Sequence, residues 1–210
     1  FKAAVELIMN GIEPNVYAVY RNSDGKMYLH MGAELLQCGI YSEDFFSKNM
    51  QSVCKRNAVC KGKAFNSAKS IIKKGLLYEG AVLKLQPYVG INYTNISLDG
   101  VKAVIHGAYH SETACVQIKN EGEKYSESSV LSLIDRCNEN GIPFILEPCS
   151  RSAYRYESTK HLLKKGAIGV YGMTSEAVYA KVLLGISLGL SAEAFEEFLR
   201  LDLNGEFVYQ

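Results

Sequence analysis

Along the second half of the chain, short continuous apolar runs alternate with stretches of helical periodicity. The apolar runs lie at residues 81–85, 101–106, 143–146 and 167–170. Continuous apolar runs of this length are typical of buried parallel strands. Helical patterns cover residues 128–138, 157–165 and 175–188, and a last helix starts after Ser191. This alternation predicts an α/β fold with a mostly parallel sheet flanked by helices.

The first half of the chain has a different pattern. Apolar residues at positions 1, 4, 5 and 8 predict a helix that ends at Asn10-Gly11, where a glycine can close the helix. Residues 16–20 and 26–30 read as two strands of a hairpin around a turn at 22–25. Because the helical pattern is already under way at Phe1 and no initiator Met precedes it, we expect the chain to be a fragment.

The amino-acid composition limits the classes of function that suit this chain. Of the 210 residues, 48% are hydrophobic and 21% are charged, and the formal net charge is +1. These values indicate a globular protein and do not indicate nucleic-acid binding. Residues 48–75 are rich in Lys and Arg and contain no acid, which is typical either of a solvated basic linker or of a nucleic-acid patch. The linker is the interpretation that the near-neutral total charge favours.

The six cysteines are dispersed through the chain without the spacing of a disulfide framework or a zinc site. There is neither a signal-peptide pattern nor an apolar run long enough to cross a membrane. We therefore expect reduced thiols, a cytoplasmic location, no contact with a membrane, and no metal or organic cofactor.

The candidate chemistry gathers at the predicted carboxyl ends of two strands. His106 and His110 follow one strand, and Cys149 follows the next. Ligands of open α/β sheets bind at this edge. The loop after His106 is thus either a ligand-binding loop or a loop whose polar groups satisfy one another, and Cys149 is a structural or ligand-lining thiol or, less simply, a nucleophile. His161, among lysines on a helix, reads as a surface residue.

The stretch Met173-Thr174-Ser175-Glu176 connects a predicted strand to a predicted helix. No phosphate-binding glycine motif surrounds it. A Thr hydroxyl in this position can accept a backbone N–H of the first helical turn, and Glu176 suits the positive end of the helix dipole. Helix capping therefore accounts for the whole junction.

Several of these segments together form a recognisable set of motifs. The set runs from Leu83 to the end of the chain and comprises KLQPYVG at 84–90, GVKAVI at 100–105 with Tyr109, GIPF at 141–144 with Cys149, Tyr156, GAI at 166–168, and MTSEA at 173–177 with Lys181. Weaker matches lie at 1–5, 15–20 and 44–49.

This set resembles the bacterial-type L-asparaginases, in particular their cytoplasmic branch. The resemblance implies that residues 1–49 are the end of the N-terminal α/β domain, 50–80 a basic linker, and 81–210 the asparaginase C-terminal domain. It also implies an amide hydrolase that converts L-asparagine to L-aspartate and ammonia, and possible use of glutamine.

The resemblance assigns no catalytic residue to this chain, because the family's threonine-containing nucleophile motifs do not occur in it. We therefore expect the chain alone to be inactive. The family lends a loop Asn to the active site of a neighbouring subunit, and here that loop contains Tyr109, His110 and Thr113, with Thr113 in the Asn position. Some members bind an effector through an Arg and a Cys; this chain keeps Cys149, has Gly107 at the Arg position, and has His106 beside it.

The family builds its sites across subunits, so a homodimer or homotetramer is implied. Two alternatives stay open. The altered loop would suit a homologue that senses an amino acid or amide without hydrolysing it. The basic stretch would suit the asparaginase-like subunit of a tRNA-dependent amidotransferase.

Overall fold

The computed structural model describes residues 1–36, 38, 41–48, 51–53, 79–109, 111–117, 125–149 and 155–207. Most of the predicted basic linker lies outside these residues. The chain forms two compact units. The first contains the described residues of Phe1–Lys69, Gly172–Ala177 and Asp202–Gln210, and the second those of Ser70–Tyr171 and Val178–Leu201. The predicted boundaries at 49 and 80 stay a prediction.

The first unit is built on the predicted hairpin. Its two strands pair antiparallel, with Val19 opposite Leu29, and the turn between them closes at Gly25, whose φ of 77° suits glycine. The predicted helix is also present and ends beside Gly11 (φ 75°). In order, the elements are α1 (Lys2–Met9), β1 (Tyr17–Arg21), β2 (Met27–Met31), the 3-10 turn η1 (Gly32–Glu34), β3 (Leu35–Leu36), β4 (Phe46–Ser47) and β5 (Gln51–Ser52).

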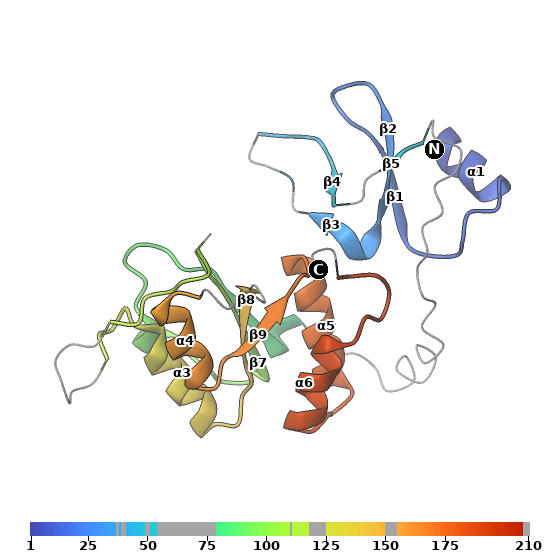
Figure 1. The fold of residues 1–210 in the computed structure, drawn as a ribbon. Coiled ribbons are helices and arrows are strands. Elements are labelled where there is room, and N and C mark those ends of the chain that lie inside the picture. Colours follow the sequence, from blue (N-terminus) through green and yellow to red (C-terminus); the bar gives the residue numbers. More distant parts are fainter. Residues whose placement is uncertain are drawn as a thin grey trace. The chain divides into compact units, whose positions relative to one another are not determined.

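The second unit contains the predicted parallel sheet. Its strands have the order β6-β7-β8-β9, so neighbouring strands in the sheet are also consecutive in the sequence. All of these pairs are parallel. In Figure 1, α3 and α4 lie on one side of this sheet and α5 and α6 on the other. The elements are η2 (Glu79–Ala81), β6 (Val82–Leu85), η3 (Tyr93–Asn95), β7 (Ala103–Gly107), α3 (Val130–Glu139), β8 (Phe144–Cys149), α4 (Glu157–Lys164), β9 (Ile168–Tyr171), α5 (Ser175–Ser187) and α6 (Ala192–Arg200).

The core of the second unit lies on both faces of its sheet. One face packs against α3 through Val104, Phe144 and Leu146, all at most 1% exposed. The middle strands are also buried on the opposite face, where Ile105 and Ile145 have no exposed surface. Burial on both faces explains why these strands are continuous apolar runs rather than alternating ones. The predicted α/β class with a parallel sheet is confirmed.

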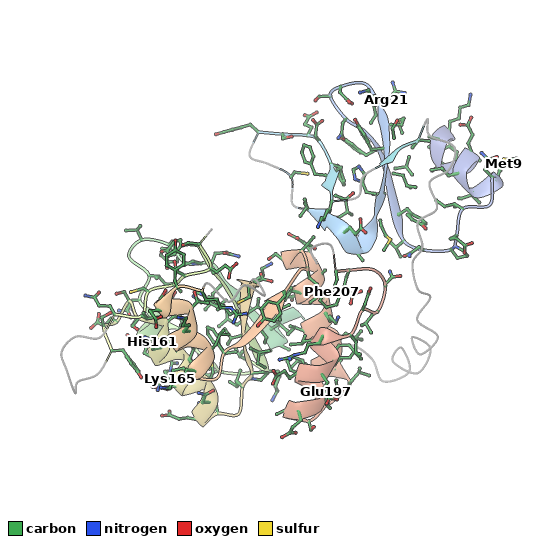
Figure 2. All side chains as sticks on the ribbon, in the orientation of Figure 1. Met9, Arg21, His161, Lys165, Glu197 and Phe207 are labelled. Atoms are coloured by element: carbon green, nitrogen blue, oxygen red, sulfur yellow. The ribbon has the colours of Figure 1, made fainter. Side chains whose placement is uncertain are left out.

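The helix caps also follow the predictions. Thr174 Oγ1 accepts the backbone N–H of Ala177 at 3.2 Å, and Ser191 Oγ accepts that of Ala194 at 3.3 Å. His161 is exposed on α4, as predicted, and Figure 2 labels it there beside Lys165. The junction at residues 173–176 therefore serves as a helix start.

Candidate functional site

The carboxyl ends of β6, β7 and β8 bring the predicted site residues to one edge of the second unit. Because the strands are parallel, the segments that follow them start at the same edge. His106 lies near the end of β7, and Cys149 is the last residue of β8. Tyr109 and Thr113 lie in the loop after β7. His110 lies outside the described residues.

His106 is a core residue with no exposed surface. Its Nε2 lies 2.7 Å from the Tyr93 hydroxyl, and its ring stacks on Phe144 with centroids 5.6 Å apart. Burial lowers the pKa of His106 to about 4, so the ring is neutral near pH 7. Nδ1 has no hydrogen-bond partner within the described part of the chain. His106 therefore joins η3 to the sheet.

Tyr93 forms hydrogen bonds through both its hydroxyl group and its backbone carbonyl oxygen. Its hydroxyl meets His106, and its carbonyl oxygen accepts a hydrogen bond from Arg136 of α3 at 3.1 Å. Arg136 also donates to the carbonyl oxygen of Ile96 at 2.6 Å. One guanidinium thus satisfies two carbonyl oxygens of a turn that is packed against α3. The sequence gives no local signal for this clamp, because it joins residues 40 and more positions apart.

Cys149 is also buried, at 5% exposure, and lies opposite Tyr171 of β9. Burial, with the nearby Glu112 carboxylate, raises the pKa of this thiol to about 12, and Arg155 only partly opposes the rise. A thiol with this pKa stays protonated at neutral pH and is a poor nucleophile. Cys149 is a structural thiol in this arrangement, and its place in an effector pocket with His106 stays a prediction.

The other face of the sheet carries a polar group that the sequence analysis did not single out. Lys84 Nζ lies 3.7 Å from Glu147 Oε1, and the Glu147 side chain is only 5% exposed. Lys84 and Glu147 straddle β7 near Gly107. A signal for this group was present, since Lys84 and Glu147 are the charged residues within two otherwise apolar strands.

Gly107 is closely covered. A Cβ atom at this position would overlap the side-chain amide of Gln86. Gly107 is the position at which the resemblance places an effector-binding Arg in other proteins. A side chain there requires the exposed Gln86 side chain to move.

The loop after β7 is a compact turn. The backbone N–H of Tyr109 donates to the Thr113 carbonyl oxygen at 2.9 Å, and the backbone N–H of Glu112 donates to the Tyr109 carbonyl oxygen at 2.8 Å. The Ser111 and Thr113 hydroxyls lie 2.9 Å apart, and Thr159 of α4 donates to the Glu112 carbonyl oxygen at 2.6 Å. Tyr109 and Thr113 are therefore brought together, and the polar groups of the loop largely satisfy one another.

Glu112 has a left-handed backbone conformation, with φ of 61°. Such a conformation costs a non-glycine residue roughly 1–2 kcal/mol. The hydrogen bond from the Thr159 hydroxyl to the Glu112 carbonyl oxygen holds the turn in this conformation.

The described residues show no group of His, Cys, Asp or Glu side chains arranged to hold a metal ion. The four cysteines among them, Cys38, Cys115, Cys137 and Cys149, are free thiols. Across the same residues, no helix is long and apolar enough to span a membrane.

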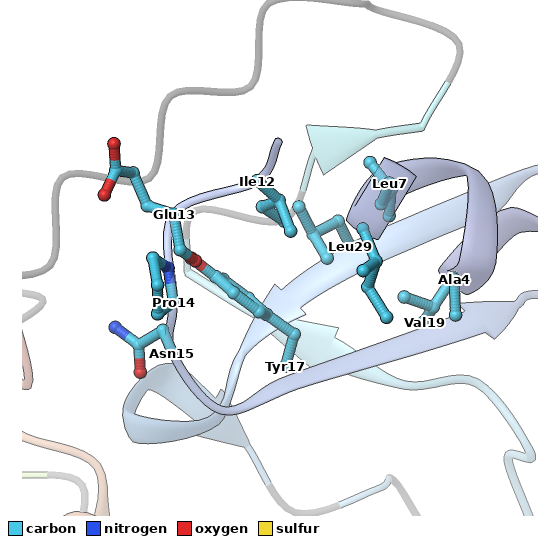
Figure 3. Close-up of a pocket in the computed structure, with 10 residues that line it drawn as sticks. Ala4, Leu7, Ile12, Glu13, Pro14, Asn15, Tyr17, Val19 and Leu29 are labelled. Carbon is cyan, nitrogen blue, oxygen red and sulfur yellow. The ribbon is translucent and has the colours of Figure 1, made fainter. Parts of the chain in front are cut away.

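A hollow of about 410 Å³ lies elsewhere, in the first unit. Figure 3 shows it between α1, the loop that follows and the β1–β2 hairpin. Most of its lining is apolar, with Glu13, Asn15 and Tyr17 adding polar groups. It lies apart in the chain from every residue that the sequence analysis proposed for a site.

Comparison with known proteins gives a fold likeness. The thermostable L-asparaginase from Thermococcus kodakarensis matches all of this chain at 16% identity with a TM-score of 0.68, and this chain spans 62% of that enzyme's length. L-asparaginase I from Vibrio cholerae O1 biovar eltor matches 61% of this chain at 24% identity with a TM-score of 0.48, over 38% of its own length. No protein-family model and no curated protein sequence matches. The first likeness shows that the chain has the fold of an L-asparaginase over the part that it spans.

Proposed function

We propose that this chain is part of an asparaginase-like amidohydrolase, which converts L-asparagine and water to L-aspartate and ammonia. The observation that carries the proposal is the likeness in fold to the Thermococcus kodakarensis L-asparaginase along the entire chain. The motifs in the sequence of the second unit also support it. Use of glutamine is a further part of the proposal.

We further propose that the isolated chain does not hydrolyse asparagine. Amide hydrolysis by covalent catalysis needs a nucleophile and a base within reach of each other. At the carboxyl edge of the sheet, Cys149 is buried and protonated, and His106 is buried and already paired with Tyr93. Neither residue is suited to attack an amide. The nucleophile would belong to residues other than these.

The role proposed for this chain is to present the loop of Tyr109, His110 and Thr113 to the active site of a neighbouring subunit. The Tyr109 side chain is 42% exposed, so its phenol is available for a contact. The Ser111 and Thr113 hydroxyls share one hydrogen bond in which either can be the donor, so the pair keeps one hydroxyl proton and free lone pairs for a substrate. A homodimer or homotetramer is the matching assembly, and the free cysteines support a reducing, cytoplasmic location.

A second candidate is a homologue that binds an amino acid or amide and does not hydrolyse it. It is favoured by the Ser111–Thr113 pair, because a hydroxyl already held within its own loop offers less than the free side-chain amide of an Asn. No comparable observation favours the tRNA-dependent amidotransferase, since most of the basic stretch lies outside the described residues.

The test compares two samples. Ammonia release from L-asparagine is measured with the 210-residue chain and with the native protein, isolated from its source through an antibody to this chain. We expect release from the native protein and none from the isolated chain. Release by the isolated chain would disprove its inactivity. Asparagine binding by the native protein without ammonia release would replace the first candidate with the second.

A further inference from the structure

The loop after β7 is fixed at both of its ends by the second unit. At its start, the backbone N–H of Ala108 donates to the carbonyl oxygen of Glu147 in β8 at 2.7 Å. Toward its end, Ala114 is 6% exposed and belongs to the hydrophobic core. Residues 109–113, which include the proposed substrate contacts, lie between these two supports.

Thr159 of α4 supplies a hydrogen bond to this middle stretch. Thr159 has no exposed surface, and its hydroxyl donates to the carbonyl oxygen of Glu112 at 2.6 Å, across 47 positions of the sequence. A threonine hydroxyl within a helix usually bonds to a carbonyl oxygen three or four residues earlier in the same helix. Here the hydroxyl bonds outside its own helix, so it supports the loop.

This hydrogen bond determines the backbone next to Thr113. The Glu112 carbonyl and the Thr113 N–H belong to one planar peptide unit, so a fixed carbonyl also fixes the torsion angles on either side of it. Glu112 has a φ of 61°, which is unfavourable for a residue other than glycine. Without the Thr159 hydroxyl this peptide unit can turn over. The Thr113 hydroxyl would then leave its position 2.9 Å from the Ser111 hydroxyl.

We propose that Thr159 is a positioning residue, which holds the Ser111 and Thr113 hydroxyls in the arrangement that binds the substrate. This inference rests on the proposed function, in which the loop contacts a substrate in a neighbouring subunit. Because Thr159 is fully buried, it acts through the loop and does not touch the substrate. If the binding arrangement is present in only a fraction of the molecules, the apparent affinity for substrate falls by that fraction. The complex, once formed, is unchanged.

The experiment uses the native protein, produced from its own gene, and two variants. Thr159→Val has nearly the same shape without the hydroxyl, and Thr159→Ser keeps the hydroxyl. We expect Thr159→Val to raise KM for L-asparagine about tenfold, the effect of one lost hydrogen bond, with little change in kcat. Thr159→Ser should have the KM of the unmodified protein. A general loss of folded protein would instead lower kcat and leave KM unchanged.

Hydrogen exchange, followed by mass spectrometry, measures the support of the loop without any need for activity. In Thr159→Val, exchange of residues 111–117 should be about tenfold faster than in the unmodified protein, because the loop opens more often. Exchange of residues 144–149, in β8, should not change. Thr159→Ser should match the unmodified protein in both segments.

The outcomes separate this inference from the proposed function. An unchanged KM in Thr159→Val, or unchanged exchange of residues 111–117, would overturn the role of Thr159. Failure of the proposed function appears in the unmodified protein, which would then release no ammonia. Asparagine affinity, measured by calorimetry, then replaces KM, and Thr159→Val should weaken it by the same factor. An unmodified protein that neither hydrolyses nor binds asparagine would refute both proposals.

Discussion

Among the described residues, each of the two units buries one histidine, and a comparison of the two sites shows how differently the units are built. His30 of β2 and His106 of β7 both have no exposed surface, and each has one ring nitrogen next to a hydroxyl, Ser47 Oγ at 3.0 Å and Tyr93 Oη at 2.7 Å. Burial lowers the pKa of both. His106, however, lies within a sheet covered on both faces, whereas the described residues of the unit of His30 leave a hollow of about 410 Å³ and pair β1 with β2 alone.

A fully buried residue can therefore occur in a unit whose remaining core is loosely packed. The second unit surrounds its sheet with helices on both sides (Figure 1). The first unit has a helix, α1, with no buried residue. We therefore expect substitutions in the packed helices of the second unit to lower the free energy of unfolding strongly. Substitutions in α1 of the first unit should lower it much less.

The largest effect is expected from removing core volume in the second unit. Leu133 of α3 has no exposed surface, and Leu133→Ala should lower the free energy of unfolding by about 2–5 kcal/mol. The matched variant Leu7→Ala, on α1, should cost about 1 kcal/mol or less, because Leu7 is only half-buried. Urea unfolding measures both. Equal losses would remove the proposed contrast between the units.

The next effect is a loss of stability in acid. Burial lowers the pKa of His106 to about 4, whereas a histidine in an unfolded chain titrates near ~6.5. Between these values the unfolded state binds more protons, so this contribution is complete above pH ~6.5 and is lost as the pH falls to about 4. The loss amounts to about 3 kcal/mol.

Replacing the titrating group checks this sign. His106→Gln should be less stable at pH 7, where it weakens the Tyr93 contact, and should lose less on acidification. His161→Gln, at the exposed histidine of α4, is the control and should follow the unmodified chain. Urea unfolding at pH 7 and pH 4.5 compares them. A pH dependence identical in His106→Gln and the unmodified chain would show that His106 is not responsible.

A smaller effect, of opposite sign, is expected in the loop after β7. Glu112→Gly should raise the free energy of unfolding by about 1 kcal/mol, since glycine adopts a φ of 61° without steric cost. Glu112→Ala removes the same carboxylate but keeps the conformational cost, so it separates strain from charge. Thermal unfolding of both variants decides the point: equal gains would assign the effect to the carboxylate beside Cys149.

An effect of similar size, but a loss of stability, is expected at the helix start of Thr174. Thr174→Ala removes the acceptor of the Ala177 N–H and should cost about 1 kcal/mol, whereas Thr174→Ser should keep most of the stability. Thr174 belongs to the first unit in its pattern of contacts. Circular dichroism during thermal unfolding measures the difference. A serine variant as unstable as the alanine variant would mean that the Thr174 methyl group, which is buried, matters more than its hydroxyl.

Much of the second unit could be predicted from its apolar runs, and the errors are instructive. A strand was predicted to begin at Val101, but β7 begins at Ala103, because Val101 still donates to Leu98 in a turn. Another was predicted to stop at Leu146, but β8 continues to Cys149 through an irregularity in its pairing with β9. Glu147-Pro148 looks like a strand end in sequence, but the strand continues past it with a shift in register between Leu146 and Cys149.

The site was less predictable than the fold. That Tyr109 and Thr113 share one turn follows from their spacing, but the burial of His106 does not. His106 lies two residues after Val104, so alternation gives both the same face of β7, and this parity was the available signal. Its partner Tyr93 comes from a separate turn held by Arg136, which no local pattern could have connected to it.

The cover that Gln86 provides over Gly107 also has an evolutionary consequence. A side chain at position 107 would meet the end of the flexible Gln86 side chain, which is exposed and can turn away. A descendant can therefore gain a larger residue at position 107 without first replacing Gln86, provided that this side chain reorients.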